Sequence, residues 1–216
     1  MNNNEQPEKR EETMTIVGTV IDDAYVKAQD PSIKIVTQGD RAYYALSGQS
    51  TYQKDASDLV NAYKEEYGNG ISTLIMIYNA TGTTLTLRGS HDYSGHIYKY
   101  PYDTTIENGE WSCVLHVHTS GWANGSIGEV GYNIGDGDHV PVGWCGWNNP
   151  FNSSDTAVAD VYQEATYHDA SWETILTKME SGGTNGTGGD NGNGYPVKYS
   201  IGEDSSPQFI VSFQKL

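Results

Sequence analysis

The middle of the chain is a series of short apolar runs, rich in β-branched and aromatic residues and separated by turn residues. The runs Ser72–Tyr78 and Thr83–Arg88 flank the turn Asn79-Ala80-Thr81-Gly82. Further runs follow at intervals of about 8 to 12 residues, a spacing typical of a β-sandwich or barrel. These runs are predicted as strands at Gly95–Tyr98, Trp111–His118, Ser126–Asn133, Pro141–Trp147, Thr156–Gln163, Val197–Ile201 and Gln208–Phe213.

Two segments have the periodicity of an amphipathic helix. Between Lys54 and Tyr67 the apolar residues recur at helical spacing, and Gly68 suits the position that ends a helix. Asp169 or Ser171 can cap a second helix that runs from Trp172 to Glu180. We expect both helices to pack their apolar faces on the β structure. The apolar face of the second helix is predicted to consist of Trp172, Ile175, Leu176 and Met179.

The remaining segments shape the expected domain organisation. Residues 1–13 are polar throughout and are predicted to form a disordered tail, and 14–20 are predicted as a short strand. Residues 22–50 have a mixed pattern, in which 40–46 could form one or two helical turns. The Gly/Asn-rich segment 182–194 is predicted to be a flexible loop. We therefore predict a mainly β protein: a single antiparallel β-sandwich domain over residues 14–216, with one or two packed helices.

The charge balance narrows the possible partners. The 216 residues include 28 acidic and 12 basic side chains, a formal net charge of −16. Such a surface repels phosphate backbones and anionic lipid, so we expect no nucleic-acid partner, whereas sugars and zwitterionic head groups remain possible. No transmembrane segment and no secretory signal are recognisable, so a cytoplasmic location is expected. Cys113 and Cys145 make no disulfide framework and are expected to be buried thiols.

Aromatic residues gather in two segments that also contain turn-forming residues, HDYSGHIYKYPYD with one Gly and one Pro, and GWCGWNNPFNSS with several Gly and Asn. Exposed rings there could stack on sugars or surround a quaternary ammonium group. The alternative interpretation is that the rings close the ends of the sandwich core. The leading hypothesis is a non-enzymatic protein that binds a glycan or a lipid head group. The residues predicted to bind this ligand are Trp144, Trp147, Phe151, Asn149, Tyr98, Tyr100 and Trp122.

A second hypothesis rests on His116-Val117-His118. Residues i and i+2 of a strand point to the same face, so both imidazoles could converge on one metal ion. His91 or His96 could supply a third ligand and leave a fourth position for water, as in zinc enzymes. The alternative is that the two histidines simply face solvent. This hypothesis describes a zinc-binding protein or a metal-dependent enzyme.

Nucleophile and nucleotide motifs are missing from the sequence. There is no G-x-S-x-G segment and no Walker A loop. The 28 acidic residues offer too many candidates for a glycosidase pair to be chosen. No catalytic residue is therefore predicted, and the sequence favours a protein that is not an enzyme.

Several longer segments resemble the plant 23 kDa jasmonate-induced proteins over roughly Ala56 to Met179. The resemblance implies a soluble plant stress or defence protein and carries no settled biochemical activity. More distantly, the order of strands and the aromatic loop Trp144–Phe151 resemble the aegerolysin and actinoporin-like β-sandwiches, which recognise lipid head groups. The jasmonate-type resemblance lies in Tyr67–Leu74, Ile77–Gly82, His91–Tyr98, Ile106–Trp111, Leu115–His118 and Ser171–Glu173.

Overall fold

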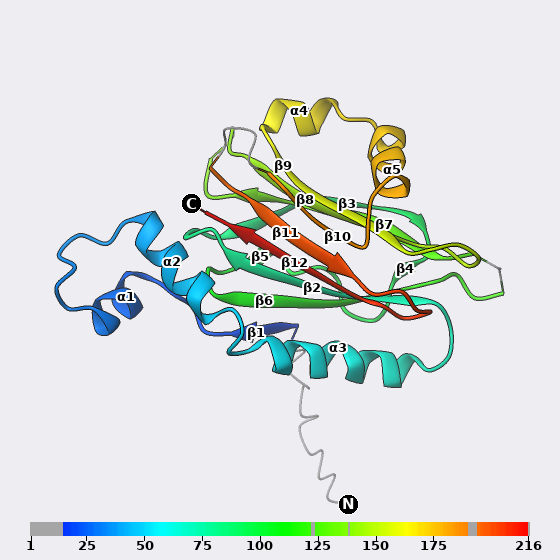
Figure 1. Ribbon diagram of the computed structural model, residues 1–216, viewed down its shortest axis with the longest axis horizontal. Coiled ribbons are helices and arrows are strands. Elements are labelled where there is room, and N and C mark those ends of the chain that lie inside the picture. The colour runs from blue at the N-terminus through cyan, green and yellow to red at the C-terminus, as the bar shows by residue number, and fades with distance from the viewer. Residues whose placement is uncertain (1–14, 122–123, 138, 190–193, 216) are drawn as a thin grey trace, which may run out of the picture.

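The computed structural model describes residues 15–121, 124–137, 139–189 and 194–215. Within these ranges two β-sheets pack face to face (Figure 1). The first sheet has the order β1 (Ile16–Gly18), β6 (Glu110–Val117), β2 (Ser72–Ala80), β12 (Gln208–Gln214), β11 (Val197–Ile201) and β10 (Asn185–Gly188), with β4 (His96–Ile97) also paired to β6. The second has the order β5 (Thr105–Ile106), β3 (Leu85–Ser94), β7 (Ser126–Ile134), β8 (Val142–Asn149) and β9 (Thr156–Tyr162). The predicted mainly β sandwich is confirmed.

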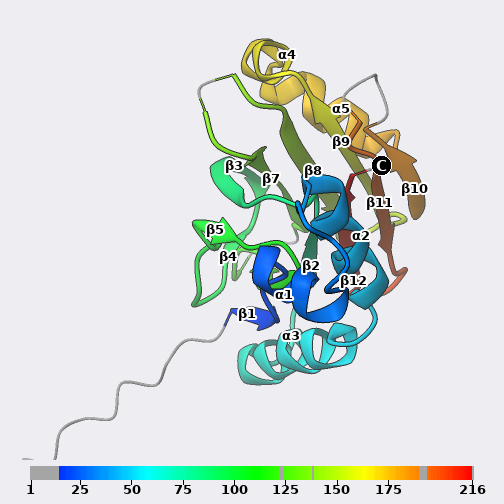
Figure 2. The ribbon, with the colours of Figure 1, turned by 90° about the vertical axis from the view of Figure 1, so that its left-hand side faces the viewer.

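Helices cover the outer face of each sheet, so the molecule has four layers (Figure 2). The first sheet is covered by α1 (Asp23–Gln29), α2 (Gln38–Gly48) and α3 (Gln53–Tyr67). The second is covered by α4 (Glu164–Asp169) and α5 (Trp172–Glu180). Helices α3 and α5 occupy the two segments whose periodicity predicts helices, α2 extends the one or two turns expected at 40–46, and α1 and α4 are additional.

Strand β2 shows why this sequence gives four layers. All nine of its residues are buried. Ile75 and Ile77 belong to the core between the sheets, whereas Leu74, Met76 and Tyr78 belong to the cluster beneath the helices. A strand buried on both faces has a continuous apolar run instead of an alternating one.

Two features differ from the expected antiparallel sandwich with a flexible loop at 182–194. Strand β12 pairs parallel to β2, because it follows β11 in an antiparallel hairpin and so runs in the same direction as β2. Within the expected loop, residues 185–188 form β10, which pairs with β11. An edge strand needs only backbone hydrogen bonds, and Gly186 lets the backbone lie against the ring of Tyr199.

The predicted tail at 1–13 and the loop residues 190–193 lie outside the described residues. In the part of the chain that the structure describes, no helix has the length and apolar character needed to cross a bilayer.

Candidate functional site

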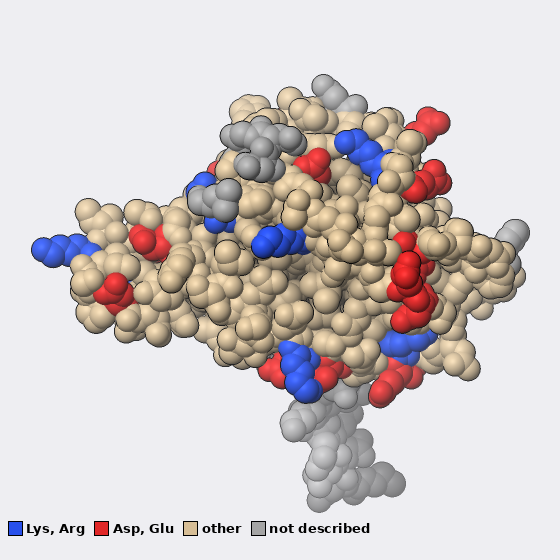
Figure 3. Space-filling model, viewed as in Figure 1, with Lys and Arg blue, Asp and Glu red and all other residues tan. Residues whose placement is uncertain are grey.

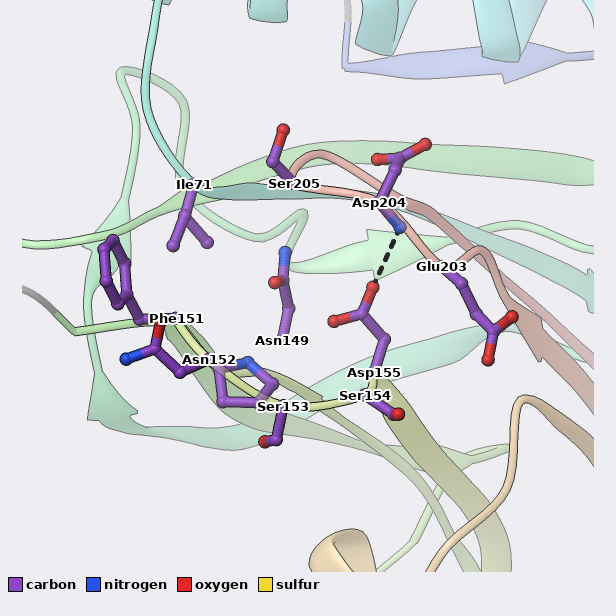
Figure 4. Close-up of a pocket in the computed structure, with 11 residues that line it drawn as sticks. Ile71, Asn149, Phe151, Asn152, Ser153, Ser154, Asp155, Glu203, Asp204 and Ser205 are labelled. Carbon is purple, nitrogen blue, oxygen red and sulfur yellow. Dashed lines mark hydrogen bonds between the residues drawn. The ribbon is translucent and has the colours of Figure 1, made fainter.

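A pocket opens at one end of the sandwich, where two loops meet the start of β2 (Figure 4). One loop, residues 150–155, joins β8 to β9, and the other, residues 202–207, joins β11 to β12. Ile71, the residue before β2, also lines the pocket. The volume is about 610 Å³, within the range of small-ligand sites. We call this cavity the loop pocket.

Two buried polar side chains fix the loops that form this pocket. Asn149 Nδ2 donates to the carbonyl oxygen of Ser72 at 3.0 Å, which ties the end of β8 to the first sheet. Asp155 Oδ2 accepts from the backbone N–H of Asp204 at 3.1 Å, the dashed line in Figure 4. Asp204 Oδ1 accepts from the N–H of Ser206 at 2.6 Å. Hydrogen bonds between distant segments therefore set the shape of the pocket.

The loop pocket is strongly acidic. Its described lining includes Asp155, Glu203 and Asp204 and no lysine or arginine. Figure 3 shows acidic side chains gathered at the end of the molecule where the β11–β12 turn lies. Burial and, less strongly, the charges of Asp204 and Glu203 raise the pKa of Asp155 to about 6, although the Asp204 N–H acts in the opposite direction. The pocket therefore attracts a positively charged group and repels an anion.

An exposed ring stands at the mouth of the pocket. The Phe151 side chain is 53% exposed and lies beside Ile71 (Figure 4). An aromatic ring, hydrogen-bonding side chains and carboxylates together suit a small cation or zwitterion that also carries apolar groups. The neutral polar side chains of the lining belong to Asn149, Asn152, Ser153, Ser154 and Ser205.

Of the residues predicted to bind ligand, Asn149 and Phe151 meet in this pocket, whereas the exposure predicted for Trp144 and Trp147 is wrong. Both tryptophans are fully buried. Trp147 packs between the sheets, with its ring centre 6.1 Å from that of Phe209, and Trp144 lies beneath α5. The glycines around them make room for core side chains and do not mark an open loop.

The predicted tyrosines also lie elsewhere. Tyr98 packs on Tyr67 of α3 and Tyr100 packs on Tyr63 of the same helix, each with ring centres 5.2 Å apart. Both belong to the half-buried rim of the cluster beneath α3 and do not line the loop pocket. Trp122 lies outside the described residues.

The histidines predicted for zinc do not converge. His118 lies beyond the end of β6, and its ring faces Tyr67 of α3 at 6.4 Å. His116 points to the opposite side of the sheet, into the core, where its ring meets that of Trp147 at 5.1 Å. His91 stacks on Trp172 at 4.6 Å. The predicted shared face is wrong because the strand ends between the two histidines.

The fourth histidine, His96, is exposed on β4. Across the described ranges, no group of three His, Cys, Asp or Glu side chains is placed to hold a metal ion. The four predicted ligands therefore do not form the zinc site expected from the sequence.

His116 instead belongs to a buried hydrogen-bond chain. Its Nδ1 lies 2.8 Å from Ser126 Oγ, and its Nε2 lies 3.3 Å from Asp92 Oδ1. Burial lowers the pKa of His116, although Asp92 acts to raise it. The order Ser–His–Asp matches a hydrolase triad, but His116 and Ser126 have no exposed surface for a substrate to reach. These hydrogen bonds link β3, β6 and β7 to one another.

The acidic residues of the loop pocket were not predicted. Asp155, Glu203 and Asp204 are three of 28 acidic residues, and no local motif distinguishes them. Their grouping depends on how the β8–β9 and β11–β12 connections meet, which only the tertiary structure reveals.

Comparisons with known proteins match the chain to one family model and to plant jasmonate-induced proteins. A model of the Nakanori-like protein family matches residues 17–216. The 23 kDa jasmonate-induced protein of Hordeum vulgare is 35% identical over 201 residues, which cover 88% of this chain and 93% of that protein. A jasmonate-induced protein homolog of Atriplex canescens is 26% identical over 116 residues, or 51% of this chain and 62% of that protein. The predicted resemblance to the jasmonate-induced proteins is confirmed.

The fold agrees with the family match. The crystal structure of the lipid-binding protein Nakanori superposes with a TM-score of 0.85 at 26% sequence identity, covering 93% of this chain and 100% of that one. Sequence and structure thus give one answer over nearly the whole length, and the chain belongs to the Nakanori-like protein family.

Proposed function

We propose that this protein binds lipid head groups, and that the loop pocket receives them. The observation that carries the proposal is the match, in both sequence and structure, to the lipid-binding protein Nakanori. The loop pocket supports it because an exposed aromatic ring stands next to polar and acidic groups at one end of the sandwich. An end of the molecule with these features can meet a membrane surface without inserting a helix.

The chemistry of the pocket favours a zwitterionic head group with an amine. The carboxylates of Asp155, Glu203 and Asp204 attract a positively charged nitrogen, and Phe151 can contact its methyl groups. The hydroxyl groups of the lining serine residues can donate to a phosphate at the mouth. With a net charge of −16, the protein disfavours a membrane of anionic lipid. Phosphatidylcholine has the combination of groups that this pocket accommodates.

Co-sedimentation with lipid vesicles tests the proposal. The wild-type protein is expected to sediment with phosphatidylcholine vesicles and much less with phosphatidylglycerol vesicles. Phe151→Ala is expected to weaken binding by about tenfold, the size typical of a central aromatic contact. Tyr43→Ala is the matched control, since Tyr43 is an exposed ring on α2, away from the pocket.

Two results would contradict the proposal. One is the absence of binding to phosphatidylcholine vesicles. The other is binding that Phe151→Ala and Tyr43→Ala leave equally strong, because the contact surface would then lie elsewhere. Retention of the wild-type circular dichroism spectrum shows that each variant remains folded.

A further inference from the structure

A second pocket lies on the outer face of the second sheet, and it originates from a pair of glycines. Gly89 on β3 and Gly131 on β7 are directly opposite each other. Tyr167 of α4 covers Gly131, where an added Cβ would lie 2.6 Å from its Oη. Nothing lies within 4 Å of the corresponding position at Gly89. The space above Gly131 is thus filled by Tyr167, whereas the space above Gly89 is open and belongs to a pocket of about 440 Å³.

One wall of this pocket is a fixed aromatic ring. Trp172 is 44% exposed, and one face of its indole stacks on the imidazole of His91, with ring centres 4.6 Å apart and planes at 6°. Tyr93 Oη donates to the carbonyl oxygen of Trp172 at 2.7 Å, which fixes the backbone there. A tryptophan held from one side leaves its other face for a ligand, and such a face suits the C–H groups of a sugar ring.

An arginine lines the other side of the same pocket. Arg88 is the extra residue of a β-bulge between Leu87 and Gly89, so its side chain is turned toward α4. Its Nη2 donates to Glu164 Oε1 at 2.9 Å. Glu164 itself does not line the pocket, but its pairing holds the guanidinium in place, and the guanidinium keeps further N–H donors for a ligand. Sugar hydroxyls can accept from the guanidinium, and the hydroxyl of Ser90 in the lining can both donate and accept.

The charges distinguish this site from the loop pocket. Arg88 is the charged residue of its lining, which disfavours a cation, and its pairing with Glu164 leaves little excess charge for an anion. Behind Tyr167, the buried Glu129 accepts from Tyr167 Oη at 3.3 Å, which disfavours an anion further. A neutral ligand with many hydroxyl groups is repelled neither by Arg88, as a cation is, nor by Glu129, as an anion is. The volume is sufficient for one sugar ring.

We propose that the pocket between β3 and the α4–α5 connection is a carbohydrate site, which binds one neutral sugar ring against Trp172 with its hydroxyls on Arg88 and Ser90. The site is separate from the loop pocket and requires no membrane. The protein would then recognise a sugar and a lipid head group through different surfaces.

Saturation-transfer NMR with free glucose, galactose, mannose and N-acetylglucosamine tests the proposal, each sugar at about 10 mM because a single ring binds weakly. At least one sugar is expected to receive saturation from the wild-type protein. Gly89→Leu is expected to reduce its affinity at least tenfold, since the side chain fills a position that is empty and has no positive φ. Trp172→Ala is expected to do the same, whereas Tyr43→Ala is expected to have no effect.

The proposal is overturned if none of the four sugars receives saturation. It is also overturned if Gly89→Leu, with an unchanged melting temperature, binds as well as the wild type. Gly89→Leu keeps the test decisive even if Trp172→Ala loses the fold. Because the assay contains no lipid, its result is independent of vesicle binding, and the two proposals can fail separately.

Discussion

Both sheets carry helices on their outer faces, but the two covers differ in how completely they satisfy the polar groups that they bury. Beneath α1–α3, Tyr78 Oη donates to the carbonyl of Ala45 at 2.6 Å and Trp111 Nε1 donates to that of Gln49 at 3.3 Å. Beneath α4 and α5, Glu129 Oε2 and Trp144 Nε1 are buried without a hydrogen-bond partner among the described residues.

The difference is informative because unpaired buried polar atoms are uncommon. The cover of the first sheet includes the 11-residue α2, which has a capping box at Thr37, and the 15-residue α3. The cover of the second sheet is shorter, leaves a pocket open at Gly89 and retains a buried carboxyl group. Departures of this kind concentrate where a fold serves binding, which agrees with the second pocket at this cover.

The largest expected effect concerns Glu129. Burial raises its pKa to about 7, from a usual value near 4.5, although the hydrogen bond from Tyr167 acts in the opposite direction. A raised pKa means that this group costs nothing below pH 4.5 and lowers the stability of the folded state as the pH rises through 7. The full cost is about 3 kcal/mol above pH 8.

Glu129→Gln is therefore expected to lose most of the fall in unfolding free energy between pH 5 and pH 8 that the wild type shows. Urea unfolding of both proteins at pH 5 and pH 8 measures this change in unfolding free energy. If the unfolding free energy falls equally in the two proteins between pH 5 and pH 8, the pKa of Glu129 is not raised. The contrast between the two helical covers would then lose its strongest support.

A medium effect is expected from two glycines of the second sheet. An added Cβ at Gly146 would collide with the buried thioether of Met179, whereas one at Gly89 meets open space. Gly146→Ala should destabilise by about 1 to 3 kcal/mol, and Gly89→Ala should change stability by less than about 0.5 kcal/mol. Thermal melting compares the pair. Equal losses would mean that the space at Gly89 is closed in solution.

The smallest expected effect is a difference in stability between variants of two buried tryptophans. Trp111→Phe and Trp144→Phe remove the same volume, but only Trp111 loses a hydrogen bond, that to Gln49. Trp111→Phe should therefore cost about 1 kcal/mol more than Trp144→Phe. Chemical unfolding of both variants measures the difference. A larger loss at Trp144 would indicate that its Nε1 is satisfied, for instance by a buried water molecule.

Much of the framework could be predicted from the sequence, because local patterns determine it. The apolar run of β2 and the helical spacing in α3 and α5 depend on burial, which the residues themselves encode. The parallel pairing of β12 with β2 could not be predicted, since it depends on the direction in which the β11–β12 hairpin lies beside β2.

The residues of the binding sites were harder to predict from the sequence, because they too depend on the tertiary structure. The sequence GWCGWNN suggests a loop with exposed rings, yet Gly143 faces Phe213 and Gly146 faces Met179, and Trp144 and Trp147 fill the core. Glycines beside aromatic residues can mark close packing as readily as turns. The loop pocket combines Ile71 with residues 149–155 and 203–205, and no local sequence pattern indicates that segments so far apart in the chain will meet.

The most direct test of the proposed lipid head-group binding is a titration of the ¹⁵N-labelled protein with soluble phosphocholine, followed by NMR. The shifts should cluster at Asn149–Asp155 and Glu203–Ser205. Binding should be weaker at pH 5 than at pH 7.5, because Asp155, with a pKa of about 6, gains a proton and the pocket loses negative charge. Shifts confined to other surfaces, or none at a concentration of about 10 mM, would contradict the proposed site.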